Sequence, residues 1–159
     1  MAEYSDAQIV ELFKKGEGRE SAFTFLVQKY QERLYWHIRR MVVDHDDADD
    51  VLQNTFLKVW SGLDGFREDS QLYTWLYRIA TNEALTFLKK KRSNLFLSLD
   101  NEEHQIGNSM ESDTYFDGNE LQVKLQKAIL RLPDKQRLVF NMKYYENMKY
   151  EEMSDMLDT

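Results

Sequence analysis

Aromatic rings alternate with cations and an amide along residues 66–92 of this chain. Aromatic faces can stack on unpaired nucleobases, while Arg, Lys and Asn side chains can bind phosphates and the edges of bases. Their concentration in one segment therefore indicates a site for single-stranded nucleic acid. The candidate residues are Phe66, Arg67, Tyr73, Trp75, Arg78, Asn82, Lys89, Lys90, Lys91 and Arg92.

Ordinary structural roles account for part of this segment. A Trp at a helical core position, such as Trp75, is more often part of the packing than of a binding site. Cations near the end of a helix interact favourably with its dipole, which explains one or two of the four consecutive cations at 89–92 but not the whole run. We therefore retain nucleic-acid binding as the predicted function of the segment.

The preceding segment is acidic and invites a calcium site, since five aspartates fall within residues 44–50. The EF-hand loop starting at Asp44 would require Gly at its sixth position and Glu at its twelfth, where the chain has Asp49 and Thr55. This register therefore fails, and no metal site is predicted. Acidic residues at the N-terminus of a helix, where the helix dipole favours them, are the simpler explanation.

Beyond these acids, the predicted acidic helix has one apolar side, which should face the core, and a second side of mixed chemistry. An acid, two amides and a leucine together suit a protein partner with a basic surface, although the same mixture also occurs on ordinary solvated helices. The residues of this second side are Asp50, Gln53, Asn54 and Leu57.

Apolar residues at helical spacing place both sets of candidates on amphipathic helices. Ser5 is expected to cap a short helix that runs to Phe13, and a long helix should follow over about residues 20–43. Gly62 and Gly65 should end the acidic helix and precede the turn that leads into the aromatic one. The predicted fold class is all-α.

Residues 93–120 separate this helical part from a second one. The segment is rich in Ser, Asn, Asp and Gly and carries seven of the 28 acidic residues but none of the 21 basic ones, so it accounts for the whole net charge of −7. It is predicted to be an acidic linker, either a solvated tether or a segment that occupies a basic groove until DNA displaces it. The predicted domains are therefore residues 1–92 and 121–159.

The composition limits the remaining functions. A chain without Cys has neither a disulfide framework nor a thiolate metal site, which suits a reducing compartment. The sequence lacks an apolar run of the roughly 20 residues that a membrane span requires, and its start lacks the pattern of a signal peptide, so we expect a cytoplasmic protein without membrane insertion. His37, His45 and His104 are isolated, and no pattern indicates a hydrolase, a cofactor or a small-molecule substrate.

The segments DADDVLQNTFLKVW and GFREDSQLYTWLYRIATNEALTFLKKKR resemble the extracytoplasmic-function sigma factors, the small promoter-specificity subunits of bacterial RNA polymerase. The run TWLYRIA, followed after one intervening residue by Asn82, is the most specific part of the resemblance. The resemblance implies two small helical domains, core RNA polymerase and promoter DNA as partners, and an anti-sigma factor as a further partner.

The resemblance also implies roles for individual residues. Asp50, Gln53 and Asn54 match positions that touch the clamp helices of the largest polymerase subunits. The family usually has Glu at position 54, so the Asn of this chain implies weaker coupling there. Leu57 belongs to the same predicted polymerase-binding set.

For the promoter, Phe66 and Arg67 match the loop that receives a flipped minus-ten base, and Asn82 borders that pocket. Stacking and hydrogen bonds to base edges must offset the few kcal/mol that base extraction costs. The remaining promoter candidates match residues at the fork between duplex and single strand, or positions that meet phosphates. The fork residues are Tyr73, Trp75 and Arg78, and the phosphate-binding residues are Lys89, Lys90, Lys91 and Arg92.

After the linker, apolar spacing predicts a helix that ends near Leu132 and a second one opened by Pro133. The final segment NMKYEEMSDMLDT resembles the first helix of a helix-turn-helix, which implies a truncated second DNA-binding domain without its recognition helix. We therefore expect Met153, Met156 and Leu157 to be partly exposed and to favour poor order or self-association.

The sequence is thus interpreted as a sigma factor that directs RNA polymerase to promoters, assists promoter melting and performs no covalent chemistry of its own. The alternative is a non-enzymatic helical protein-interaction module without DNA recognition, in which the acidic helix is the interface and the aromatic residues only pack. A hydrolase is the least supported interpretation.

Overall fold

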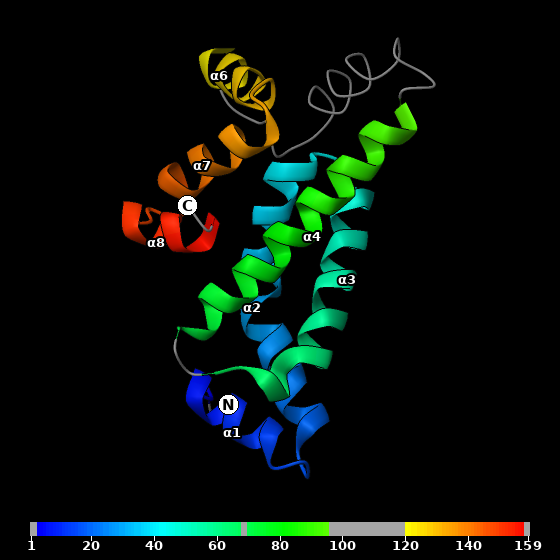
Figure 1. Ribbon diagram of the computed structural model, residues 1–159, viewed down its shortest axis with the longest axis vertical. Helices are drawn as coiled ribbons and strands as arrows, with labels where there is room; N and C mark the ends of the chain where they lie inside the picture. The colour runs from blue at the N-terminus through cyan, green and yellow to red at the C-terminus, as the bar shows by residue number, and fades with distance from the viewer. Residues whose placement is uncertain (1–2, 68–69, 96–119, 158–159) are drawn as a thin grey trace.

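The structure is a computed structural model that describes residues 3–67, 70–95 and 120–157. Within these ranges all regular secondary structure is helical, which confirms the predicted all-α fold class (Figure 1). Most of the predicted linker lies outside the described residues. The elements are α1 (Asp6–Lys14), α2 (Arg19–Val42), α3 (His45–Gly62), the short 3-10 helix η1 (Leu63–Gly65), α4 (Leu72–Leu95), α6 (Glu120–Leu130), α7 (Asp134–Tyr144) and α8 (Tyr150–Leu157).

Local sequence signals determine where the first helices begin. Ser5 and Gln8 form a capping box at the start of α1, in which each side chain accepts a hydrogen bond from the other residue's backbone N–H. Asp44 caps α3 by accepting a hydrogen bond from the Asp47 N–H at 3.1 Å. The acidic start of α3 therefore lies at a helix N-terminus, as the sequence suggested, and the structure adds the cap by Asp44.

The corner between α2 and α3 is made by Val43, whose φ of 74° lies in the left-handed region. A β-branched residue rarely adopts this conformation, so its surroundings must hold it there. The Val43 N–H donates to the Arg39 carbonyl at 2.9 Å, and the Val43 carbonyl accepts from the Arg39 Nε at 2.5 Å. Arg39 thus fixes the angle between the two helices.

α2, α3 and α4 pack around a common interior, each with one buried stripe (Figure 1). His37 lies at its centre, stacked on the Tyr77 ring with 3.8 Å between centroids and hydrogen-bonded through Nε2 to the Thr81 hydroxyl at 2.8 Å. Burial lowers the pKa of His37 to about 3, with a smaller contribution from the nearby Arg40. His37 is therefore neutral and structural.

The buried stripes include Leu26, Leu34, Ile38 and Met41 of α2, Ala48, Val51, Thr55 and Val59 of α3, and Leu72, Leu76, Ala80 and Ala84 of α4.

The C-terminal helices pack back onto this bundle. The Arg137 guanidinium of α7 donates to the carbonyl of Met41 at the end of α2, and also to the carbonyls of Leu130 and Leu132 in the α6–α7 turn. Burial lowers the pKa of Arg137, and the neighbouring Asp134 opposes that effect. This side chain of α7 therefore links the end of α2 to the α6–α7 turn through their backbone carbonyls.

The expected exposure of the last helix is wrong for two of its methionines. Met153 and Met156 are only 5% and 7% exposed, because α8 closes against the same apolar cluster that contains Leu138 and Met142 of α7. This cluster is continuous with the interior of the first bundle. Burial of this kind could not be predicted from the short α8 sequence alone.

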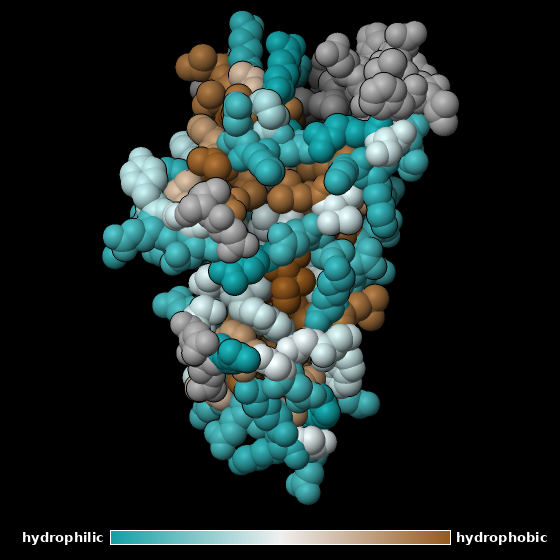
Figure 2. Space-filling view, viewed as in Figure 1, coloured by the Kyte–Doolittle hydropathy of each residue, from teal (hydrophilic) through white to brown (hydrophobic). Residues whose placement is uncertain are grey.

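The exposed surface is mainly hydrophilic in the view of Figure 2, with hydrophobic residues gathered near α6 and α7. Leu121 and Leu125 of α6 are 75% and 51% exposed, so one apolar side of this helix is uncovered. None of the helices in the described ranges combines the length and apolar character that crossing a bilayer requires.

Candidate nucleic-acid and protein interfaces

The outward side of α3 presents the four residues predicted to bind polymerase. Asp50, Gln53 and Asn54 are all exposed, and Leu57 is 66% exposed. Their positions on consecutive turns follow from burial of the opposite stripe of the same helix. The structure thus brings an acid, two amides and an uncovered leucine together on one face. Such a face can contact a protein through a small apolar centre with polar groups around it.

At Phe66, the loop that follows η1 lies against α1. The Phe66 ring is 5% exposed and packs on Trp75 with 5.2 Å between centroids, while the Phe66 carbonyl accepts a hydrogen bond from Lys14 Nζ at 2.9 Å. A cavity of about 270 Å³ opens beside this loop, close to the lower limit of about 300 Å³ for ligand pockets. It is lined by Asp6, Ala7, Val10, Phe66, Ser70, Gln71 and Leu72.

Trp75 is partly buried and partly exposed, which is compatible both with core packing and with contact to DNA. A Cβ on Gly62 would lie 3.4 Å from the Trp75 ring, an ordinary van der Waals contact, so the indole lies against the end of α3. Trp75, Arg78 and Asn82 share one side of α4 at positions i, i+3 and i+7, and the last two are exposed. Asn82 does not line the cavity beside Phe66. The exposed Arg67 extends the loop side of this set.

The C-terminal helices α6–α8 and their connections, called here the C-terminal block, contact two of the predicted promoter residues. The half-buried Tyr73 donates its hydroxyl hydrogen bond to Glu146 at 3.2 Å, and the Arg33 guanidinium lies 3.6 Å from the Tyr73 ring centre. Burial and then the Glu146 charge raise the pKa of Tyr73. Arg78 donates to the Asp155 carbonyl of α8 at 3.4 Å. Both residues are thus engaged by protein groups.

The four consecutive cations at the end of α4 divide into two pairs. Lys89 and Lys90 are exposed, as phosphate binding would require. Lys91 pairs with Asp47 in the first turn of α3 at 3.0 Å, and Arg92 pairs with Asp134 at the start of α7 at 2.6 Å. The second pair therefore also has a structural role.

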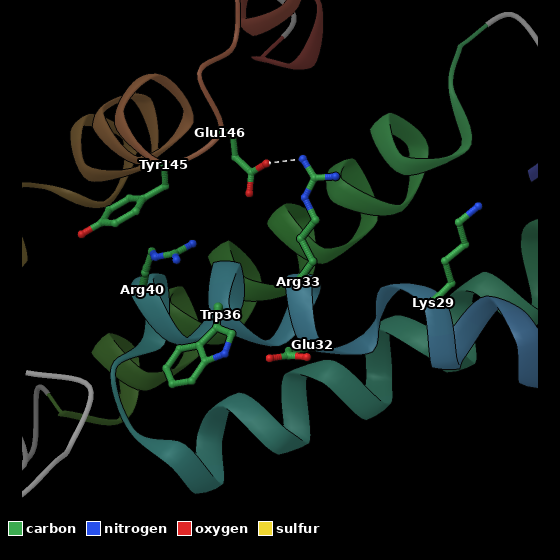
Figure 3. Close-up of a pocket in the computed structure, with 7 residues that line it drawn as sticks. All are labelled: Lys29, Glu32, Arg33, Trp36, Arg40, Tyr145 and Glu146. Atoms are coloured by element: carbon green, nitrogen blue, oxygen red, sulfur yellow. Dashed lines mark hydrogen bonds and ion pairs between the residues drawn. The ribbon is translucent and has the colours of Figure 1, made fainter. Parts of the chain in front are cut away.

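A further set of cations escaped the sequence prediction, although its spacing was visible there. Lys29, Arg33, Trp36 and Arg40 stand at i, i+4, i+7 and i+11 on α2, which is the period of one helical face. A groove of about 430 Å³ lies along them, completed by Glu32 and by the C-terminal block (Figure 3). The apolar stripe of α2 predicts the helix, and the period of these cations marks a second face of the same helix.

Comparison with known proteins identifies two matching families. The chain matches Sigma-70 region 2 over residues 26–94 and Sigma-70, region 4 over residues 122–159. It is 30% identical to the RNA polymerase sigma-H factor of Pseudomonas aeruginosa, covering 99% of this chain and 84% of that protein. It is 31% identical to the ECF RNA polymerase sigma factor SigW of Bacillus subtilis, covering 91% of this chain and 81% of that protein.

Comparison with solved structures also finds similar proteins. An engineered region 2 of sigmaE, determined in complex with GTAAAA, is 36% identical and aligns with a TM-score of 0.53, covering 60% of this chain and 98% of that one. CnrH in complex with the cytosolic domain of CnrY aligns with a TM-score of 0.60 over 94% of this chain and 80% of that one. At 21% identity, this second likeness concerns the fold alone.

Proposed function

Because the chain belongs to the ECF RNA polymerase sigma factors, which act in transcription initiation, we propose how its helices divide that work. The observation that carries the proposal is the presence of two unlike outward faces on one bundle. α3 exposes the acid, amide and leucine face, while the loop before α4 and α4 itself expose an amide and cations beside the half-buried rings of Tyr73 and Trp75.

Core polymerase is the proposed partner of Asp50, Gln53, Asn54 and Leu57. Their exposure, and the burial of the opposite stripe of α3, leave this face available to a basic surface with an apolar centre. Asn54 retains a hydrogen-bond acceptor but lacks the charge of the family's usual Glu. We therefore expect the polymerase contact at this position to be the weaker part of the interface.

Promoter minus-ten DNA is the proposed ligand of Phe66, Arg67 and Asn82. The cavity beside Phe66 supports insertion of a base next to an aromatic wall, and the exposed Asn82 amide can read the edge of a base. The similar region 2 of sigmaE was solved with GTAAAA, which is the same class of ligand. A base inserted beside Phe66 would be held by stacking, while Asn82, which does not line that cavity, would contact a separate base.

The other promoter residues are proposed to act next to this pocket. Tyr73, Trp75 and Arg78 would meet the fork between duplex and single strand. The cations of 89–92 would neutralise phosphates, with Lys89 and Lys90 the more available. These residues fix the position of the DNA, and the catalysis belongs to polymerase.

We further propose residues 1–92 and 121–159 as the functional domains, with 93–120 as the connection between them. An anti-sigma factor is the proposed inhibitory partner, because CnrH was solved with the cytosolic domain of CnrY and RpoE of Bartonella quintana with the anti-sigma factor NepR. The proposed location is the cytoplasm, where core polymerase acts.

Reconstitution with sigma-free core polymerase and a library of promoters tests this proposal. The chain should yield transcripts selected by their minus-ten sequence, and Asn82→Ala should alter that selection while leaving polymerase affinity unchanged. Thr86→Ala, an exposed change one turn further along α4, is the matched control. Polymerase binding without selected transcripts would instead favour a protein-interaction module.

A further inference from the structure

An acidic side chain of the C-terminal block already occupies the cationic groove on α2. Glu146 accepts a hydrogen bond from Arg33 through Oε2 at 2.8 Å and one from the Tyr73 hydroxyl through Oε1 at 3.2 Å. The Glu146 side chain is only 7% exposed. Donors from two different helices therefore converge on one anion, and the same arrangement suits the oxygens of a phosphate.

Arg40 supplies a second anion-binding group along the same stripe. Its guanidinium lies 4.0 Å from the Tyr145 ring centre, and within the described residues its buried Nε has no hydrogen-bond partner. Arg40 is therefore held beside the groove by its stacking on Tyr145, with an Nε donor that no protein group of the described residues uses. Lys29 is less available, because it pairs with Asp6 at 2.7 Å.

Figure 3 shows Arg33 and Arg40 extending from α2 on the side where Tyr145 and Glu146 approach. Arg33 and Arg40 are seven positions apart, about 10 Å along a helix axis, so they would engage different phosphates rather than one. The groove is also joined to the promoter candidates of α4 through Tyr73, which Arg33 covers. An extended polyanion fits these features better than a small anion does.

We propose that Arg33, Arg40 and Tyr73 form a further binding surface for the sugar–phosphate backbone of a promoter DNA strand, and that Glu146 occupies its phosphate position in the free protein. This inference rests on the proposed function, and it extends the DNA contact from α4 across to α2. DNA and the α7–α8 connection then compete for the same donors. The strand gains this surface when Glu146 leaves.

Anisotropy of labelled single-stranded oligonucleotides tests the proposal. One probe contains GTAAAA and the other is oligothymidine of equal length, each titrated over a range of salt concentrations. Arg33→Ala and Arg40→Ala should weaken binding of both probes alike and each reduce the salt slope by about 0.7, the value for one phosphate contact on a single strand. Glu146→Gln should strengthen binding about fivefold, since it weakens the competing occupant.

Matched controls separate the groove from general charge effects. Glu151→Gln removes the same charge from an exposed position on α8 and should change affinity less than Glu146→Gln does. Arg33→Lys keeps the charge and should retain the salt slope, and circular dichroism checks that every variant is folded. Equal effects of the two Glu variants, or an unchanged salt slope in Arg33→Ala and Arg40→Ala, would overturn the inference.

The same titrations with the chain bound to core polymerase distinguish two kinds of failure. If the proposed function is wrong, the wild-type chain will not form that complex or select promoters. If only the groove inference is wrong, the complex will form and the Arg33 and Arg40 variants will bind fork DNA as the wild type does. A free mononucleotide that displaces the probes at equal phosphate concentration would indicate a small-anion site and also overturn the proposal.

Discussion

The outward faces of α2 and α3 are opposite in charge, although both helices bury similar apolar stripes in the same interior. α2 presents Arg33, Trp36 and Arg40, whereas α3 presents Asp50 and Leu57. The buried stripes explain why the helices form and pack, but they do not distinguish one partner from another. In the proposals above, the difference between the outward faces is where partner choice is encoded, with a polyanion proposed for the α2 face and a protein for the α3 face.

Removing part of the common interior should damage both faces together, and this is the largest effect we expect. Leu34→Ala deletes a fully buried side chain from α2 and should lower the free energy of unfolding by about 2–5 kcal/mol. Leu57→Ala makes the same deletion at an exposed position and should change it by about 0.5 kcal/mol or less. Urea unfolding measures both. Equal losses would mean that the interior is not what supports the two faces.

Acidification should act on the interior without touching either face directly. The pKa of His37 is lowered from 6.5 to about 3 in the folded chain, so between these values the unfolded state binds a proton that the folded state excludes. The contribution of neutral His37 to the free energy of unfolding should be fully present above about pH 6.5. It should fall as the pH is lowered, by about 2 kcal/mol at pH 5.

Unfolding curves at pH 7 and pH 5 check this expectation. His37→Gln should lose most of the difference between the two curves, while His45→Gln, at the exposed start of α3, should keep it. A His37→Gln variant that remained as acid-sensitive as the wild type would assign the effect to carboxylates instead.

A cation placed on the α3 face should weaken polymerase binding and leave DNA binding unchanged. Leu57→Arg should weaken core polymerase binding about tenfold or more, because anchors at interface centres typically contribute over 1 kcal/mol. Affinity for single-stranded DNA should remain at the wild-type level. Gln136→Arg adds the same charge at an exposed position of α7 and serves as the control in both binding measurements. Similar losses of affinity for polymerase and for DNA would show that the two faces do not bind separate partners.

Restoring the family's usual acid on α3 should have the smallest effect. Asn54→Glu should raise polymerase affinity about threefold at low salt, and the gain should shrink as salt screens the exposed charge. Asn54→Gln keeps the amide and should give no gain. A gain that persists at high salt would have to come from packing rather than charge.

The helices and their caps could be predicted because the signals are local. Ser5 with Gln8, and Asp44 before α3, lie within a few residues of the backbone groups that they satisfy. The exposure of Asp50, Asn54 and Leu57 likewise followed from the period of one helix. Residue spacing alone is sufficient for such features.

The arrangement of the C-terminal block could not be predicted in this way. Burial of Met153 and Met156, and the bond from Arg137 to the Met41 carbonyl, depend on contacts between segments far apart in the chain. The pairing of Tyr73 with Glu146 is of the same kind. The cationic stripe of α2 differs, since its spacing is plain in the sequence, and only its acidic occupant required the structure.

The corner at Val43 determines how the two proposed partner faces are oriented relative to each other. One residue with an unfavourable torsion, held by Arg39, joins α2, which carries the proposed phosphate-binding surface, to α3, which carries the proposed polymerase-binding face. Glycine at this corner would adopt the same torsion and many others, so the angle between the two faces would be held less firmly.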